Sequence, residues 1–207
     1  YQFYNEIRSK GWQLRGVQEP LENMFFAGNE DLYAYRYDWD NLRDFFVGDF
    51  RKIIGAAHAL EIPMISGDFS LAEEFAWIIY PRSPSRRFVS KNMMNFWTEF
   101  ATNGEPGKSS NDIIWNKYNP ETDKSILHID EKKDFRIDNL DLSMQKLVKE
   151  ILSSQVIDAE EKCILLYETT NYIGDNSFDD FVKSTNFNCS RDEALRISEK
   201  NSGTIDF

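Results

Sequence analysis

Apolar residues recur at helical spacing in several segments of the chain. The clearest stripe lies between Arg86 and Asn103, where large apolar side chains fall at i, i+4, i+7, i+8 and i+11 (Val89, Met93, Phe96, Trp97 and Phe100). Gly104 and Pro106 follow directly, as is common after the last turn of a helix. We therefore predict a helix over residues 86–103 that packs on the body of the protein through this stripe.

A second pattern has a period of two and predicts a strand. Over residues 32–39 aromatic side chains alternate with Leu32, Ala34, Arg36 and Asp38. Both sets are substantial, which is typical of a sheet covered on two sides. Residues 125–130 predict another short strand.

Helix-start signals place further helices along the chain. The opening segment predicts helical turns that break near Gly16 and close at Gly28, and residues 140–152 predict another helix. Three pairs have the spacing of a capping box: Ser70 with Glu73, Asp158 with Glu161, and Ser190 with Glu193. The first of these predicts a helix that runs to about Ile79. Strands followed by amphipathic helices predict an α/β layer, with helices packed on a sheet.

Composition and charge narrow the class of protein. The chain has 207 residues with 41% hydrophobic and 14% aromatic side chains, enough to bury a core, and a formal charge of −11. Without a long Lys/Arg cluster, an acidic chain neither releases many counterions from nucleic acid nor adheres to an anionic membrane. No window approaches the ~20 apolar residues of a membrane span. We expect one domain, or part of one.

The cysteines and the first residue bear on the compartment and on the extent of the chain. Cys163 and Cys189 are too few for a disulfide framework, although they could form one bridge in an oxidising compartment. We expect a cytoplasmic location, with secretion as the alternative. The chain opens with Tyr1 and no apolar leader, so we expect a processed product or a piece of a longer protein.

His58 is the first candidate for chemistry. It follows Gly55, Ala56 and Ala57, whose small side chains leave an imidazole accessible. A histidine with an ordinary pKa of ~6.5 can accept and return a proton at neutral pH. A histidine among small residues is nevertheless more often structural, and His128, in a charged strand, fits that interpretation better.

Other kinds of site find little support. Glu61 lies three residues after His58, but two distant histidines and two cysteines supply too few ligands for zinc or iron, so we expect no metal or cofactor. The chain has no Gly-x-Ser-x-Gly, no phosphate-binding loop and no dinucleotide-binding glycine pattern. Cys163 lies in an apolar helical run, which disfavours its pairing with His58 as a nucleophile.

Three ordered blocks carry a resemblance to a known family: Tyr33–Trp39, Gly55–Pro63, and Asn95–Ala101 with Gly104-Glu105-Pro106. Together they resemble the C-terminal part of the type-B carboxylesterases, which include cholinesterases and bile-salt lipases, and bacterial members are most similar. The resemblance covers residues 10–170 or so and leaves a polar tail, 171–207, unmatched. It implies that residues 1–207 are the C-terminal segment of one α/β-hydrolase catalytic domain, with its last central strands, covering helices and an incomplete sheet.

The resemblance also implies an activity. His58 takes the position of the triad base, Glu61 and Gly55 support the histidine loop, and Ala59 stands where the family has glycine. The nucleophilic serine, the triad acid and the oxyanion loop precede the histidine in the family, so the N-terminal remainder of the polypeptide would supply them. The implied whole protein is a serine carboxylesterase acting on small-molecule esters, with this chain inactive alone. One alternative is a non-catalytic cholinesterase-like binding or adhesion protein, and another is a self-contained interaction domain of accidental similarity.

Overall fold

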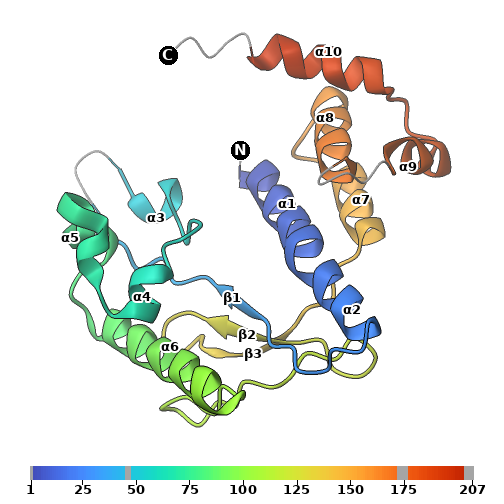
Figure 1. Ribbon diagram of the computed structural model, residues 1–207. Helices are drawn as coiled ribbons and strands as arrows, with labels where there is room; N and C mark the ends of the chain where they lie inside the picture. The colour runs from blue at the N-terminus through green and yellow to red at the C-terminus, as the bar shows by residue number, and fades with distance from the viewer. Residues whose placement is uncertain (1, 45–47, 172–176, 203–207) are drawn as a thin grey trace. The chain divides into compact units, whose positions relative to one another are not determined.

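The computed structural model describes residues 2–44, 48–171 and 177–202, and these ranges form a mixed α/β structure (Figure 1). The side chains of residues 71–73 and 201–202 lie outside this description. The chain divides into two compact units, one made of residues 1–26 and 141–207 and the other of residues 27–140. Each unit has its own cluster of buried apolar side chains.

A three-stranded sheet of order β1-β2-β3 lies in the unit of residues 27–140. β1 (Tyr35–Tyr37) runs parallel to β2 (Ser125–Ile129), and β2 runs antiparallel to β3 (Arg136–Asn139). All five residues of β2 are buried, as expected of a strand covered on both faces. The strand predicted over residues 125–130 is therefore confirmed, whereas the polar edge strand β3 is not predicted by any alternation.

The strand predicted over residues 32–39 is too long. Its ladder covers Tyr35 to Tyr37 because β2 opposes only these residues. Upstream, the carbonyl of Leu32 accepts a hydrogen bond from the backbone N–H of Tyr118 (2.7 Å), which belongs to a loop. The alternation still holds, since Leu32 and Ala34 are buried while Tyr33 and Tyr35 are half-buried.

The helices of this unit are α3 (Phe50–Ile53), α4 (Ile62–Ser66), the 3₁₀ helix η2 (Phe69–Phe75), α5 (Ala76–Ile79) and α6 (Pro84–Asn103). The predicted long helix is confirmed as α6, which starts two residues earlier because Ser83 Oγ accepts a hydrogen bond from the N–H of Arg86 (3.0 Å). Its stripe packs inward through Phe96, whose ring lies 5.4 Å from that of Trp115. α6 thus covers the aromatic core beside the sheet (Figure 1).

The helix predicted to start with a capping box at Ser70 starts one residue earlier, and its predicted end near Ile79 is confirmed as the end of α5. The segment begins as η2 at Phe69, and the carboxylate of Asp68 accepts a hydrogen bond from the backbone N–H of Ser70 (2.9 Å). Asp68 therefore acts as the N-terminal acceptor and Ser70 lies inside the first turn. The side chain of Glu73 falls outside the described residues.

The unit of residues 1–26 and 141–207 is helical. α1 (Gln2–Gln13) continues through a π-helical turn, η1 (Leu14–Gln18), into α2 (Glu19–Phe26). The break predicted near Gly16 is thus a local widening of the helix. The helix predicted over residues 140–152 is α7 (Met144–Ser153), which begins after Ser143, whose Oγ accepts a hydrogen bond from the N–H of Lys146 (3.2 Å).

α8 (Ala159–Thr170) is the central helix of this unit, in contact with α1, α7 and the two helices that follow it. Its predicted capping box is confirmed, because Asp158 and Glu161 each accept the other's backbone N–H at 2.9 Å. None of the described helices is both long and apolar enough to cross a membrane.

The polar tail is folded where the structure describes it. It contains α9 (Phe178–Thr185), which was not predicted, and α10 (Arg191–Ser202), which starts where Ser190 Oγ accepts the N–H of Glu193 (3.2 Å). Cys163 on α8 forms a disulfide with Cys189, with the two Cα atoms 5.7 Å apart. The disulfide that the sequence allowed is therefore formed, and it links the tail to α8.

Candidate functional site

The candidate histidine lies in an irregular turn between α3 and α4. His58 is exposed, and the turn around it contains two residues with positive φ, Gly55 (58°) and Ala59 (71°). Glycine adopts this conformation freely, but a residue with a Cβ atom does so at a cost. The chain direction on either side of His58 therefore depends on two left-handed residues, one of them strained.

Contacts from α6 and the end of α5 hold this turn. Met64, fully buried on α4, accepts a hydrogen bond at its carbonyl from Ser90 Oγ on α6 (3.0 Å). The carbonyl of Leu60 accepts one from the hydroxyl of Tyr80 (3.0 Å). The imidazole is thus displayed on a turn whose far end is anchored in the core.

Glu61 stands at the N-terminus of α4, half-buried. Its backbone carbonyl accepts the N–H groups of Met64 and Ile65, both at 3.0 Å. Burial, with the nearby charge of Glu61, raises the pKa of Tyr80 to about 12, and the same two causes raise the pKa of Tyr35. The carboxylate of Glu61 therefore lies within electrostatic reach of Tyr80 and Tyr35.

His128 occupies a different environment. It is 5% exposed, on β2, and its Nε2 lies 2.7 Å from Oδ2 of Asp38, which also accepts a hydrogen bond from Nε of Arg36 (2.7 Å). Burial opposes ionisation of Asp38, but hydrogen bonds from His128 and Arg36 outweigh it and hold the pKa of this carboxyl below its usual range. His128 is thus a structural histidine that joins β1 to β2.

The structure also bears on metal and thiol chemistry. Among the described residues no three His, Cys, Asp or Glu side chains come together as a metal would require. The sulfur of Cys163 is bonded to Cys189, so it does not serve as a free thiol nucleophile.

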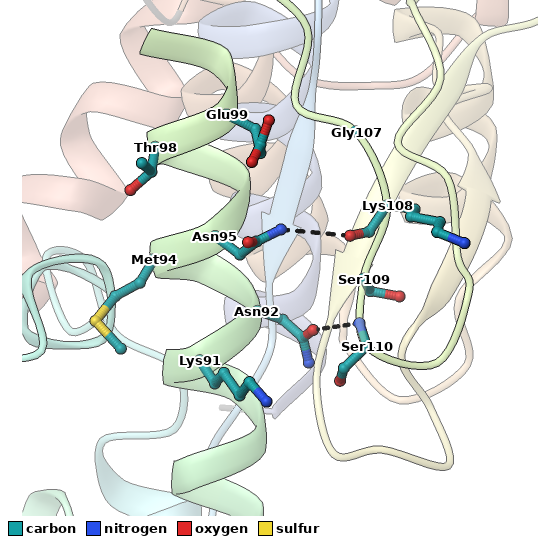
Figure 2. A pocket seen from close by; sticks show the side chains of 10 residues that line it. All are labelled: Lys91, Asn92, Met94, Asn95, Thr98, Glu99, Gly107, Lys108, Ser109 and Ser110. Atoms are coloured by element: carbon teal, nitrogen blue, oxygen red, sulfur yellow. Dashed lines mark hydrogen bonds between the residues drawn. The ribbon is translucent and has the colours of Figure 1, made fainter. Parts of the chain in front are cut away.

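A polar groove of about 680 Å³ lies elsewhere, between α6 and the loop that follows it (Figure 2). None of Gly55, His58 and Glu61 lines it. Asn92 bridges it, since its side-chain oxygen accepts the N–H of Ser110 (2.7 Å) and its amide donates to the carbonyl of Phe88 (2.9 Å). The groove lies where the loop is hydrogen-bonded to α6, and it is separate from the candidate site.

The sequence alone did not predict two features of the site, the contact from Tyr80 and the left-handed turn at Ala59. Tyr80 carried no sequence signal beyond its place before Pro81 at a helix end. The left-handed turn did have a signal, because Ala59 stands at a position where the resembled family has glycine, the residue best suited to positive φ.

Comparison with known proteins identifies the family. The model of the carboxylesterase family matches residues 14–150, more than half of the chain. Among solved structures, a "thermophylic PNB esterase" is similar at 25% sequence identity and a TM-score of 0.40, over 56% of this chain. The chain spans only 21% of the length of that esterase. No curated protein matches. As the three sequence blocks predict, the chain belongs to the carboxylesterase family, with a partial α/β fold.

Proposed function

We propose that the full-length protein is a serine carboxylesterase that cleaves neutral carboxylic esters through an acyl-enzyme. The family match supports ester hydrolysis in general. The observation that carries the finer proposal is the exposed His58 on a turn whose following residues are anchored by Tyr80 and Ser90. An accessible, fixed imidazole is what a general base requires.

In this mechanism His58 acts twice on a serine supplied by the rest of the polypeptide. Its Nε2 first takes the proton of the serine hydroxyl as the oxygen attacks the ester carbonyl. It then gives that proton to the alcohol as the alcohol leaves, and an upstream carboxylate holds the other ring nitrogen. Hydrolysis of the acyl-enzyme by water repeats the two proton transfers. Glu61 and Gly55 support the histidine turn and take no part in bond making.

The N-terminal remainder of the polypeptide is the proposed partner of this chain. Within the described residues, β1 pairs with β2 on one side only. We place a strand of the remainder at the other edge of β1, where unpaired backbone groups would otherwise favour association with other chains. Without that remainder the serine, the acid and the oxyanion donors are missing, and the chain alone is expected to be inactive.

The disulfide supports a proposal about the compartment in which the protein is found. Both cysteines of the chain are joined in one buried bridge, and such bridges persist in oxidising compartments. This favours secretion over the cytoplasmic location expected from the cysteine count.

Replacement of His58 tests the activity. In the full-length protein, His58→Ala should lower hydrolysis of p-nitrophenyl acetate by roughly 10³-fold or more, because triad members act as a unit. His128→Gln is the matched control, since it removes the other histidine of the chain and should change stability with little effect on turnover.

Near-normal turnover in a folded His58→Ala protein would refute the assignment. A full-length sequence without an upstream Gly-x-Ser-x-Gly serine would instead support the alternative, a cholinesterase-like binding protein that has lost catalysis.

A further inference from the structure

Tyr80 reaches the histidine turn from the end of α5. Its side chain is 2% exposed, and its ring lies nearly parallel to that of Trp39, at 7° with the centroids 6.5 Å apart. Its hydroxyl donates a hydrogen bond to the carbonyl oxygen of Leu60 (3.0 Å), two residues after His58. A buried side chain thus makes its single described hydroxyl contact with the backbone of the turn.

Tyr80 is itself held from a second direction. Nη1 of Arg86 donates to the carbonyl oxygen of Tyr80 (2.7 Å), and the guanidinium of Arg86 lies over the ring of Phe69, 4.2 Å from its centroid. The rings of Phe69 and Tyr80 are 5.4 Å apart. The hydroxyl is therefore presented by a fixed ring, which makes it a suitable anchor.

The turn needs such an anchor because its own bonds are short-range. Leu60 N–H bonds to the carbonyl of Ala57, and Ile62 N–H bonds to the carbonyl of Ala59, both at 3.2 Å. Between them Ala59 holds φ at 71°, a conformation that persists for a residue with a Cβ atom only where the surroundings impose it. The contact from Tyr80 is a long-range restraint on Leu60, the residue directly after this strained alanine.

We propose that Tyr80 is a positioning residue for His58: its hydroxyl holds the carbonyl of Leu60 and thereby keeps the turn at Ala59 and the direction of the imidazole. The inference rests on the proposed function, because it assigns Tyr80 to the orientation of the general base. Because Tyr80 is buried, it acts through the turn rather than on substrate, and its loss should affect the chemical step more than substrate binding. Misplacement of a catalytic group by about 1 Å can lower a rate by 10²-fold.

The test uses Tyr80→Phe in the full-length protein, which keeps the ring against Trp39 and removes one hydroxyl. We expect kcat for p-nitrophenyl acetate to fall by roughly 10-fold while KM changes by less than about 2-fold. Tyr37→Phe is the matched control: Tyr37 is another tyrosine in the same core, and its hydroxyl is buried without a hydrogen-bond partner among the described residues. That control should leave kcat and KM unchanged.

An unchanged kcat in Tyr80→Phe, or a change in KM alone, overturns the proposal. A second readout is independent of activity: amide hydrogen exchange at Leu60 and Ile62 should become faster in Tyr80→Phe and stay as in the parent protein in Tyr37→Phe. If His58→Ala retained turnover, the proposed function would fail, yet the exchange measurement would still decide whether Tyr80 holds the turn. Equal exchange in both tyrosine variants would show that it does not.

Discussion

The turn around His58 and the helices around α8 are stabilised in different ways. The helices bury apolar side chains such as Leu165, Phe178 and Ile197, and a disulfide joins α8 to the segment just before α10. The turn exposes its histidine, contains a strained alanine, and depends on hydrogen bonds from Tyr80 and Ser90. Burial along a helix leaves a periodic trace in the sequence, whereas single long-range hydrogen bonds leave none.

The largest effect should come from the disulfide. Replacing both Cys163 and Cys189 with alanine releases a bridge across 26 residues, which should lower the free energy of unfolding of the helices by about 3 kcal/mol. Hydrogen exchange of α9 and α10 in the full-length protein measures this loss.

The matching control is the parent protein with a thiol reductant, which should reproduce the variant, while amides of the histidine turn keep their exchange rates. Equal protection of α9 and α10 with and without the bridge would mean that burial alone holds the tail.

A smaller effect of opposite sign is expected at the turn. Ala59→Gly should raise the free energy of unfolding by about 1 kcal/mol, because glycine avoids the clash that a Cβ atom causes at positive φ. Chemical denaturation of the full-length protein measures it. Ala57→Gly in the same turn is the control and should destabilise slightly, since Ala57 does not have a positive φ. A loss of stability in Ala59→Gly would show that the alanine methyl packs better than its conformation costs.

The smallest expected effect is on the stability of the protein at acidic pH. The lowered pKa of Asp38 means that its ionised form contributes stability above the unfolded value of ~3.9, and that this contribution disappears as pH falls through the lower folded value. Asp38→Asn should therefore reduce the drop in melting temperature between pH 5 and pH 3. The corresponding change in the free energy of unfolding should stay below about 1 kcal/mol, because the Asp38 side chain is 36% exposed and water screens its pairing with His128. The same drop in melting temperature in the parent protein and in Asp38→Asn would show that ionised Asp38 does not contribute to stability.

Sequence alone predicts the parts of the molecule that depend on local signals. The stripe of α6 and the reciprocal caps of α8 are both found, because periodicity and capping act within a few residues. The length of β1 is overestimated because its ladder depends on which residues of β2 lie opposite it. The disulfide and the Tyr80 contact depend on residues that only the fold brings together.

The candidate site likewise has features that the sequence predicts and features that it does not. The resemblance directs attention to His58, Glu61 and Gly55, and the left-handed φ of Gly55 gives a physical reason for glycine there. It also points to Ala59, which stands where the family has glycine, but it does not reveal the contact that Tyr80 makes from the end of α5.

The parallel pairing of β1 with β2 has a consequence for the order of folding. The chain between Tyr37 and Ser125 contains the histidine turn and α6, so the two strands meet only after a long connection has closed. On the ribosome, β1 must wait unpaired with β2 until synthesis has passed Ile129, while the local contacts of α6 can already form. The edge of β1 that pairs with β2 is thus exposed to misassembly during that interval, and slow translation between the two strands would prolong it.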